Sequence, residues 1–408
     1  MDTEPGFVSP RICSRNLGFV DSSRGDGPAL ESRLEAFCEH MRGVAVPEDE
    51  GDATKLYVQE LAEAGFLDLM VPSAYRSADP RPGNPRGDAV SSLAICLTRQ
   101  WLSRVSGALD TAFVMQGLGS YPVTLAGTDA LKQALLPRVA QGQAICAFAL
   151  TEPGAGSDIK AMQTTAHPQN DGSVVIEGSK CFISNAGVAD SYVVFAREGV
   201  PEGEQTPAKP RFGAFWISGD SPGLRVEPTR VIAPHPIGKL FFEGVKVPAE
   251  HRLGVHGQGL RIALGNLDVF RVSVGAAALG LADEALAVAT KHLRTRVQFG
   301  KPLAAQQGLQ FALADVATDH LAAQLLVYRA ACARDTDQAS PDQAAMAKMF
   351  ATESSQRAID RAVQCLGGLG VTVGETPERL YREIRALRIY EGTTEIQKLI
   401  IARALLRP

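Results

Sequence analysis

The spacing of apolar residues changes twice along the chain, and these changes limit the folds that the sequence can adopt. Residues 27–143 carry apolar side chains at the helical period of about 3.6, as in the segment Asp129–Ala140. Residues 144–254 are dominated instead by alternating patterns and by β-branched or aromatic side chains, which are typical of strands. From residue 255 to residue 408 the helical period returns. The sequence therefore predicts an N-terminal all-α domain, a middle β domain and a C-terminal helical domain.

The middle zone contains the pattern of several short strands. The Asn170-Asp171-Gly172 tripeptide lies between two of them and predicts a hairpin turn. Turn signals recur about every dozen residues, which predicts a small sheet or barrel and argues against strand–helix–strand units. The expected strands are Ala144–Leu150, Ser173–Glu177, Tyr192–Ala196, Phe212–Ser218, Leu224–Pro228 and Lys239–Val247.

The last zone has the pattern of a helical bundle. A run of small residues, Val274–Gly280, lies in the middle of the longest helical pattern and would let another helix approach closely, in a bundle interior or at a subunit contact. Several long helices after a β zone predict a four-helix bundle at the C-terminus. The expected helices are Gln258–Arg296, Leu303–Arg334, Pro341–Leu366, Glu378–Arg388 and Ile396–Leu406, and the N-terminal zone adds Ala53–Gly65.

Composition argues against several classes of function. The formal net charge of -4 does not favour binding to nucleic acid or to an anionic membrane, which both attract positively charged proteins. No uninterrupted apolar run approaches the roughly 18 residues of a membrane span. Residues 1–26, expected to form a flexible extension, lack the apolar core of a secretory signal. The cysteines are scattered without a CxxC and the histidines without an HExxH, so we expect no disulfide frame, no metal site and a reducing, cytoplasmic location.

The end of the chain holds the candidate catalytic residue. In the segment Arg388–Gln397, the carboxylate of Glu391 lies just before an apolar helical pattern, beside a glycine and two threonines. The dipole and the free N–H groups of a helix N-terminus favour an ionised carboxylate, and a general base needs an ionised, partly desolvated carboxylate. By residue type alone, the more common role for such a residue is to cap the helix.

Two motifs of the middle zone could meet a cofactor. Thr151–Asp158 follows an apolar strand, and its glycines and serine would offer N–H groups and a hydroxyl to a phosphate, although a tight turn leaving a strand also explains it. A dinucleotide site of the Rossmann type is not supported, because the next segment is rich in strands and is not a crossover helix. In Lys180–Gly187, Phe182 could stack on a ring and Ser184 could donate a hydrogen bond, or the segment is a strand that ends in a turn.

Two motifs of the helical zone have the same two interpretations. In Arg294–Pro302, Arg296 could clamp a pyrophosphate, or it belongs to the basic end of a helix. In Gln364–Gly370, three glycines could let a ligand approach the backbone, or they form the loop that ends a helix.

Taken together, the order and spacing of these motifs resemble the acyl-CoA dehydrogenase family from about Leu61 to Leu406. The segments that carry the resemblance are ALTEPGAGSD, GSKCFISNAG, RTRVQFGKP, QCLGGLG and RIYEGTTEIQ. The resemblance implies a flavoprotein oxidoreductase that holds FAD between its β domain and its four-helix bundle. It also implies a homotetramer, built as a dimer of dimers, that passes electrons to an electron-transferring flavoprotein.

The resemblance also assigns roles by position. Contacts to the flavin or its phosphates, with the Ser184 hydroxyl near flavin N5, are implied for Phe148, Leu150, Thr151, Gly156, Ser157, Phe182 and Ser184. Positions that reach the FAD of a neighbouring subunit match Arg296, Phe299, Gln307, Gln364, Gly367 and Gly368, and FAD contacts that follow the base match Thr393 and Glu395. The acyl-CoA would meet Ser157, Asp268, Arg271, Tyr390, Gly392 and Arg403.

Within this family Glu391 is implied to be the base. It would remove the α-proton of an acyl-CoA thioester while a hydride leaves Cβ for flavin N5, giving the trans-2-enoyl-CoA. Some branches carry the base on the long helix at the position of Phe270, and phenylalanine cannot accept a proton. An acyl-CoA oxidase that uses O₂ and a non-catalytic family member are the alternatives.

Two segments depart from the family pattern. Val231–Gly238 stands where a Gly-x-Arg-x-Ser pattern is usual, and its His235 could touch an acyl or pantetheine group or belong to an ordinary turn. Ser77–Gly87 is a longer, proline-rich loop. Both are expected near the mouth of the substrate site, so the sequence does not predict the shape of the acyl chain.

Overall fold

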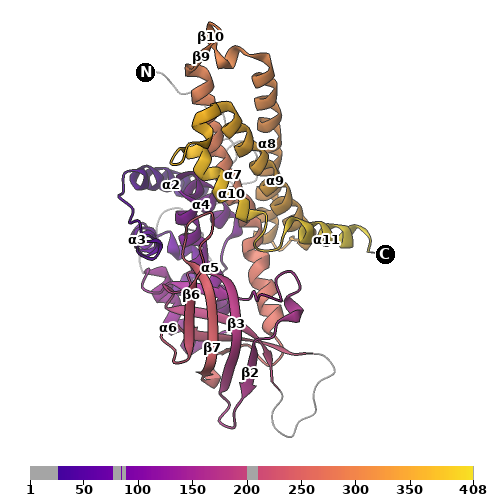
Figure 1. Ribbon diagram of the computed structural model, residues 1–408. Coiled ribbons are helices and arrows are strands. Elements are labelled where there is room, and N and C mark those ends of the chain that lie inside the picture. Colours follow the sequence, from indigo (N-terminus) through magenta and orange to yellow (C-terminus); the bar gives the residue numbers. More distant parts are fainter. Residues whose placement is uncertain (1–25, 77–83, 85–88, 200–209, 408) are drawn as a thin grey trace. The chain divides into compact units, whose positions relative to one another are not determined.

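The computed structural model describes residues 26–76, 84, 89–199 and 210–407 (Figure 1). Apart from Asp26 and Asn84, the predicted N-terminal extension (residues 1–26) and the proline-rich loop (Ser77–Gly87) therefore lie outside the described residues. The first helices are α2 (Asp26–Arg42), α3 (Glu50–Glu63), α4 (Ser92–Val105), α5 (Gly107–Ala126) and α6 (Asp129–Ala140).

Packing divides the chain into two compact units. The helical unit takes its described residues from Met1–Val44, Ser91–Asp110 and Arg271–Pro408. The sheet unit takes them from Ala45–Val90 and Thr111–Phe270. The helices that precede the sheet in sequence are thus shared between the units. The domain boundaries expected from the sequence remain predictions.

The sheet unit is built on one mixed sheet of eight strands. Seven of them follow the order β6-β7-β3-β2-β4-β5-β8. The eighth, β1, lies outside this order and pairs in parallel with β4. Strands β2 and β3 form the predicted hairpin, in which Pro168 pairs with Val174. The strands are β1 (Cys146–Ala149), β2 (Thr165–Pro168), β3 (Val174–Ser184), β4 (Ser191–Glu198), β5 (Phe212–Ser218), β6 (Leu224–Pro228), β7 (Ile237–Val247) and β8 (Arg252–Leu253).

The core of the sheet unit lies between the sheet and α6. Leu131, Leu135 and Val139 recur at helical spacing on α6 and pack in one cluster with Val193 and Phe195 of β4. These side chains are all less than a tenth exposed. Burial of each such aliphatic or aromatic side chain is worth about 1.5–3 kcal/mol, so this shared face holds the helix on the sheet.

The helical unit is a bundle centred on three long helices. These are α7 (Gly259–Thr295), α8 (Gln307–Asp335) and α9 (Pro341–Leu366), and α9 packs against α8, α10 (Thr376–Leu387) and α11 (Thr394–Leu405) (Figure 1). A short hairpin of β9 (Val297–Gln298) and β10 (Lys301–Pro302) links α7 to α8. The predicted start of α8 at Leu303 was wrong, because Leu303–Ala305 forms a separate 3₁₀ turn and Gln306 is extended.

The small residues of α7 serve close packing inside this bundle. A Cβ at Gly280 would lie 2.1 Å from the main-chain oxygen of Gln100, and one at Gly275 would lie 2.8 Å from Val327. Both distances are far below van der Waals contact, so glycine is required there. Of the two interpretations left open by the sequence, the bundle interior is the one that the structure shows for these two residues.

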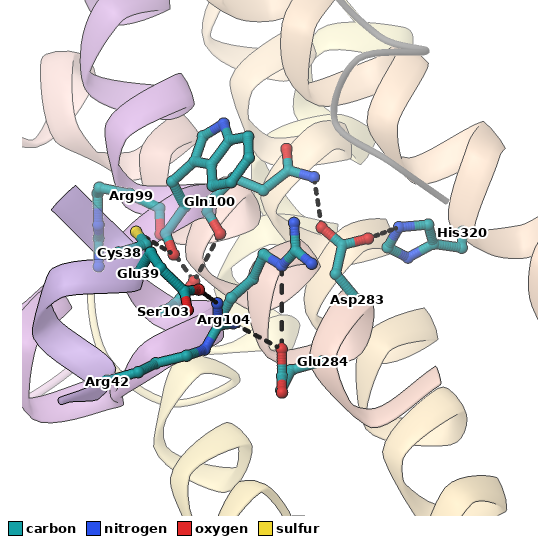
Figure 2. A network of polar contacts seen from close by, with 11 residues as sticks. Cys38, Glu39, Arg42, Arg99, Gln100, Ser103, Arg104, Asp283, Glu284 and His320 are labelled. Atoms are coloured by element: carbon teal, nitrogen blue, oxygen red, sulfur yellow. Dashed lines mark hydrogen bonds and ion pairs between the residues drawn. The ribbon is translucent and has the colours of Figure 1, made fainter. Parts of the chain in front are cut away.

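A buried polar network joins α4, α7 and α8 inside the helical unit. Asp283 accepts a hydrogen bond from the Gln100 amide at 2.8 Å, and its other oxygen lies 2.8 Å from His320 Nε2 (Figure 2). Tyr328 donates to the Gln100 oxygen at 2.6 Å. Buried networks of this kind fix which helices meet, because a mismatched packing would leave polar groups unpaired.

Among the described helices, α7 is long and apolar enough to cross a membrane by length and composition. However, 83% of its most apolar window is buried inside the protein. The core helix of a bundle passes the same test, so this is weak evidence for a membrane span.

Candidate active site

The candidate base lies in the turn between α10 and α11. The side chain of Thr393 accepts a hydrogen bond from the Ile396 N–H and so caps α11, which begins at Thr394. Glu391 precedes the cap by two residues. The capping interpretation of Glu391 is therefore wrong, and its side chain needs another explanation.

The backbone of this turn is held in an unfavourable conformation. Both Glu391, with φ of 53°, and Gly392, with φ of 92°, lie in the left-handed region. For a residue other than glycine this costs about 1–3 kcal/mol and persists only where the surroundings enforce it. A Cβ at Gly392 would lie 2.6 Å from Gln397 Nε2, so a larger residue there would displace the amide that donates to the turn.

Three side chains of the helical unit enforce the turn by holding its carbonyl oxygens. Lys348 Nζ and Gln397 Nε2 each donate to the main-chain oxygen of Gly392 at 2.8 Å. Arg271 Nε donates to the main-chain oxygen of Glu391 at 3.4 Å. Lys348 comes from α9, Arg271 from α7 and Gln397 from α11, so the turn that contains the strained Glu391 is fixed from three helices.

The carboxylate of Glu391 is placed where its basicity rises. Its Oε2 is buried and has no hydrogen-bond partner among the described residues. Burial raises its pKa above the ordinary value, and the positive charges of Arg99, Arg271 and Lys348 lower it only in part. The balance leaves a carboxylate that is a stronger base than one in water, yet has cations close enough to stabilise its ionised form.

The nearby cation Lys348 responds to the same surroundings. Burial lowers the pKa of Lys348 to about 8, and the Glu391 charge raises it in part. A fully buried lysine is uncommon, and Lys348 is the charged residue on an otherwise uncharged buried face of α9. It contacts the turn through Gly392 and acts on the charge of Glu391.

A buried ion pair forms a second layer beside Glu391. Arg99 of α4 donates to both oxygens of Asp110 at 2.8 and 2.7 Å and to Ser273 Oγ at 2.9 Å. Burial alone would lower the pKa of Arg99, but the Asp110 carboxylate holds it above its ordinary value. Burial also raises the pKa of Tyr390, whose hydroxyl interacts with Arg99 although the residue as a whole is 37% exposed. The charges of Arg99 and Asp110 thus act on Glu391 with opposite signs and partly cancel.

In the sheet unit, a buried ion pair fixes the start of the first glycine motif. Lys180 of β3 donates to Glu152 at 2.8 Å and to the main-chain oxygen of Leu150 at 3.0 Å. Burial lowers the pKa of Lys180 to about 8. Burial alone would raise the pKa of Glu152, but Lys180 and the N–H groups of Gln163 and Thr164 bring it below its ordinary value. The end of β1 is therefore tied to β3.

This tie brings two of the predicted motifs together. The N–H of Cys181 donates to the main-chain oxygen of Thr151 at 2.9 Å. Beyond that point the loop is open, because a Cβ at Gly154 or Gly156 would meet nothing within 4 Å. The neighbouring Phe182 has φ of 55° and is 62% exposed, and it lies near the end of β3, where the pairing with β7 is irregular between Lys180 and Ile183. An open glycine loop beside an outward-facing aromatic side chain fits a ligand with a phosphate and a flat ring.

The strand ends with a polar pair. Ser184 Oγ lies 3.2 Å from Nε2 of His235, and Nδ1 of His235 lies 3.0 Å from the main-chain oxygen of Ala233. His235 is thus neither a loose side chain nor simply part of a turn, but a partner of a predicted site residue.

The other predicted residues fall into two groups. In the sheet unit, Phe148 packs its ring 5.0 Å from that of Phe195, while Ser157 and Asp268 are exposed. In the helical unit, the exposed residues at the ends of helices are Arg296, Phe299, Gln307, Gln364, Gly367, Gly368, Glu395 and Arg403. The structure joins Arg271, Gly392 and Glu391 directly, whereas no contact within the described residues ties Arg403 to them.

Several residues of the site were not predicted from the sequence, among them Gln397 and three buried charges of the helical unit. Lys348, Arg99 and Asp110 all lie on helices whose other buried residues are mostly apolar or uncharged. A lone charge at an apolar position of a helical pattern is the signal that could have found them, because such a charge needs a buried partner.

Comparison with known proteins identifies the family to which the chain belongs. Profiles of the acyl-CoA dehydrogenase N-terminal, middle and C-terminal domains match residues 29–143, 147–245 and 257–406. The chain belongs to the acyl-CoA dehydrogenase family. The family assignment and the three-part fold predicted from the sequence are thereby confirmed.

Individual acyl-CoA dehydrogenases match over most of their length. An acyl-CoA dehydrogenase of Bacillus subtilis (strain 168) is 37% identical over 353 residues, covering 86% of this chain and 89% of the relative. A cyclohex-1-ene-1-carbonyl-CoA dehydrogenase of Syntrophus aciditrophicus (strain SB) is 35% identical over 393 residues, covering 93% of this chain and 91% of the relative.

Solved structures of acyl-CoA dehydrogenases match as well. The butyryl-CoA dehydrogenase of Megasphaera elsdenii has a TM-score of 0.80 and 31% identity, with 100% of both chains covered. An acyl-CoA dehydrogenase of Bacillus anthracis complexed with FAD has a TM-score of 0.78 and 28% identity, covering 99% of this chain and 68% of that one.

Proposed function

We propose that this protein oxidises an acyl-CoA thioester to the trans-2-enoyl-CoA, with Glu391 as the base that removes the α-proton. The protein is a flavin-dependent oxidoreductase of the acyl-CoA dehydrogenase type, and FAD is its cofactor. The observation that carries the proposal is the buried, unpartnered Oε2 of Glu391, held at a strained turn by contacts from three helices.

The sheet unit has the features that FAD requires. The open loop at Gly154 and Gly156, with the exposed Ser157, would take the phosphates, and the outward-facing ring of Phe182 would lie against the flavin. Phe148, Leu150, Thr151 and Ser184 would complete these contacts. When bound, FAD would supply the acceptor for the hydride that leaves Cβ.

The residues around Glu391 do the remaining work. The raised pKa of Glu391 suits proton removal near neutral pH, because a general base is most effective when its pKa is close to the pH at which the enzyme works. The charges of Lys348 and Arg271 favour the ionised form of the carboxylate and offset part of the effect of burial. Gly392 and Tyr390 lie in the turn, and Arg271 of α7 donates to its Glu391 carbonyl. We propose that all three contact the acyl thioester, with Ser157, Asp268 and Arg403 as further contacts.

A partner subunit and an electron acceptor belong to the same proposal. Phe299 is 91% exposed at a φ of 52°, and Val371 and Val373 are 68% and 85% exposed. Exposed apolar residues at one end of a bundle favour a subunit contact. We propose a homotetramer in which Arg296, Phe299, Gln307, Gln364, Gly367 and Gly368 reach the FAD of a neighbouring subunit, and in which Thr393 and Glu395 contact FAD after the base.

We also propose an electron-transferring flavoprotein as the acceptor. Its support is a chain in the structure described as the electron transferring flavoprotein of Acidaminococcus fermentans, which matches with a TM-score of 0.79 and 33% identity over 100% of both chains. A cytoplasmic location accords with the six described cysteines, none of which forms a disulfide with another described residue.

An anaerobic titration tests the proposed reaction. The FAD-loaded protein is mixed with straight, branched and alicyclic acyl-CoAs while the visible absorption of the flavin is followed. Rapid bleaching by one class would establish the reaction and identify the class of substrate. Bound FAD that no thioester bleaches would contradict the proposal, and rapid reoxidation by O₂ in place of the flavoprotein acceptor would instead identify an oxidase.

A further inference from the structure

The contacts of His235 determine which of its nitrogens carries the proton. Nδ1 lies 3.0 Å from the main-chain oxygen of Ala233. A carbonyl oxygen can only accept, so Nδ1 must donate. In a neutral imidazole the other nitrogen then carries a lone pair, and Nε2 must accept from the Ser184 hydroxyl, 3.2 Å away. The proton of Ser184 therefore points at His235.

The backbone holds this pair rigidly. Two prolines, Pro234 and Pro236, flank His235, and each restricts the backbone of its neighbourhood. The N–H of Asn185 donates to the main-chain oxygen of Pro236 at 2.7 Å. Ser184 itself pairs with Ile237 at the start of β7. Ser184 is thus the last residue of β3, and His235 lies two residues before β7, the strand that pairs with β3.

The surroundings keep the imidazole neutral near neutral pH. Burial lowers the pKa of His235, while the hydrogen bond to Ala233 and the charge of Glu50 on α3 raise it in part. Glu50 is the one charged group among the described residues that acts on the ring in this way.

We propose that His235 is a positioning residue that accepts the hydrogen bond of the Ser184 hydroxyl and so leaves Ser184 Oγ as a hydrogen-bond acceptor toward the flavin. This inference rests on the proposed function, which lays Ser184 near flavin N5. The sequence assigned Ser184 the role of a donor. The contact with His235 reverses that role, because a hydroxyl has one proton to donate and Ser184 donates it to His235.

The reversed role has a consequence for the redox equilibrium. Reduced flavin carries a proton at N5 and donates there, whereas oxidised flavin accepts there. An acceptor at Ser184 therefore stabilises the reduced cofactor relative to the oxidised one, which is one of the ways in which a protein tunes a flavin. One hydrogen bond is worth about 0.5–1.5 kcal/mol, so we expect an effect of about 2- to 10-fold on the redox equilibrium constant.

Four variants separate this role from a merely structural one. His235→Phe and Ser184→Ala should each make the midpoint potential of bound FAD more negative, by an amount equivalent to about 2- to 10-fold in the equilibrium constant. His235→Gln, whose amide oxygen can accept, should restore much of the potential. His251→Gln is the matched control, because His251 is a partly buried histidine of the same unit that packs on Trp216 and should leave the potential unchanged.

Two further measurements keep the proposal testable if a variant does not fold. Nitrogen-15 NMR spectra of the wild-type protein labelled with nitrogen-15 histidine should show His235 protonated at Nδ1 and unprotonated at Nε2. As the pH falls and His235 becomes protonated, Nε2 donates to Ser184 Oγ, and the Ser184 hydroxyl is free to donate elsewhere. The plot of the FAD midpoint potential against pH should therefore show an additional change of slope in the wild type, and His251→Gln should retain it.

The outcomes distinguish this inference from the proposed function. An Nε2-protonated His235, or a His235→Phe variant whose potential equals that of the wild type while acyl-CoA still bleaches its flavin, would overturn the inference alone. A wild-type protein that binds FAD but is bleached by no thioester would overturn the proposed function, and the His235 tautomer would still be measured independently.

Discussion

Lys348 Nζ donates a hydrogen bond to the main-chain oxygen of Gly392 at 2.8 Å, one residue after the candidate base. The same ammonium group acts electrostatically on Glu391, whose pKa it lowers in part. A single buried cation therefore both fixes the backbone of the turn and adjusts the basicity of its side chain. This double role links the strained conformation of Glu391 to its chemistry.

Replacing Lys348 by methionine removes both the charge and the hydrogen bond to Gly392, and the pH dependence of activity isolates the effect of the charge. Without the cation, the pKa of Glu391 should rise further, so the acidic limb of the kcat/KM profile should move to higher pH. Activity should then fall several-fold at mildly acidic pH and much less at alkaline pH. Steady-state kinetics across pH measure this, and Lys398→Met, at an exposed lysine of α11, is the control. A limb that stays in place would show that Lys348 does not act on Glu391.

The buried carboxylate should also lower stability at neutral pH. Since the folded pKa of Glu391 lies above its unfolded value, ionisation favours the unfolded state, and stability is lost as pH rises from the unfolded through the folded pKa. Glu391→Gln should therefore raise Tm relative to the wild type at neutral pH, and the gain should shrink below the unfolded pKa of about 4.3. Thermal unfolding at several pH values tests this, and a gain independent of pH would contradict it.

The close packing of α7 predicts opposite effects for one substitution at two sites. Gly280→Ala places a Cβ 2.1 Å from the Gln100 oxygen and should destabilise the protein by about 1–3 kcal/mol. Gly265→Ala on the same helix meets Leu125 at an ordinary 3.5 Å and should be neutral or stabilising by up to about 1 kcal/mol. Thermal unfolding of both variants checks the contrast. Equal Tm values would show that the helices can separate at Gly280 without cost.

Arg296 tests the proposed contact with a neighbouring subunit. Its side chain is exposed directly after α7, and Arg296→Ala should weaken FAD retention or the tetramer because a phosphate would lose its guanidinium partner. FAD content after gel filtration and the mass in solution measure both effects. Arg294→Ala, at an exposed arginine in the last turn of α7, should change neither. Identical behaviour of the two variants would exclude Arg296 from the cofactor site.

The regular parts of the fold could be predicted from the sequence because periodicity reports burial. Asp129–Ala140 and Pro341–Leu366 were predicted with the bounds that α6 and α9 have, since capping residues or proline mark their starts. The start of α8 was missed by four residues, because an apolar triplet after Pro302 can form a 3₁₀ turn as readily as a helix.

The site could be predicted only in part, because its decisive contacts join distant segments. Glu391 was found from a local break in the helical pattern, and the role in capping was left open. The hydrogen bond from Lys348 to the Gly392 carbonyl joins residues 44 positions apart, and the pair of Ser184 with His235 joins residues 51 positions apart. No local pattern reports such distances, so Lys348 was missed and His235 was noticed only as a departure from the family.

The substitution Glu391→Gln tests the central claim most directly. Because glutamine keeps the shape of the side chain but cannot accept the α-proton, turnover of the preferred acyl-CoA should fall by about 10²- to 10⁴-fold, while FAD content and acyl-CoA affinity remain close to those of the wild type. Glu375→Gln, at an exposed glutamate before α10, controls for the chemical change. Near-normal turnover in Glu391→Gln would contradict the assignment of Glu391 as the base.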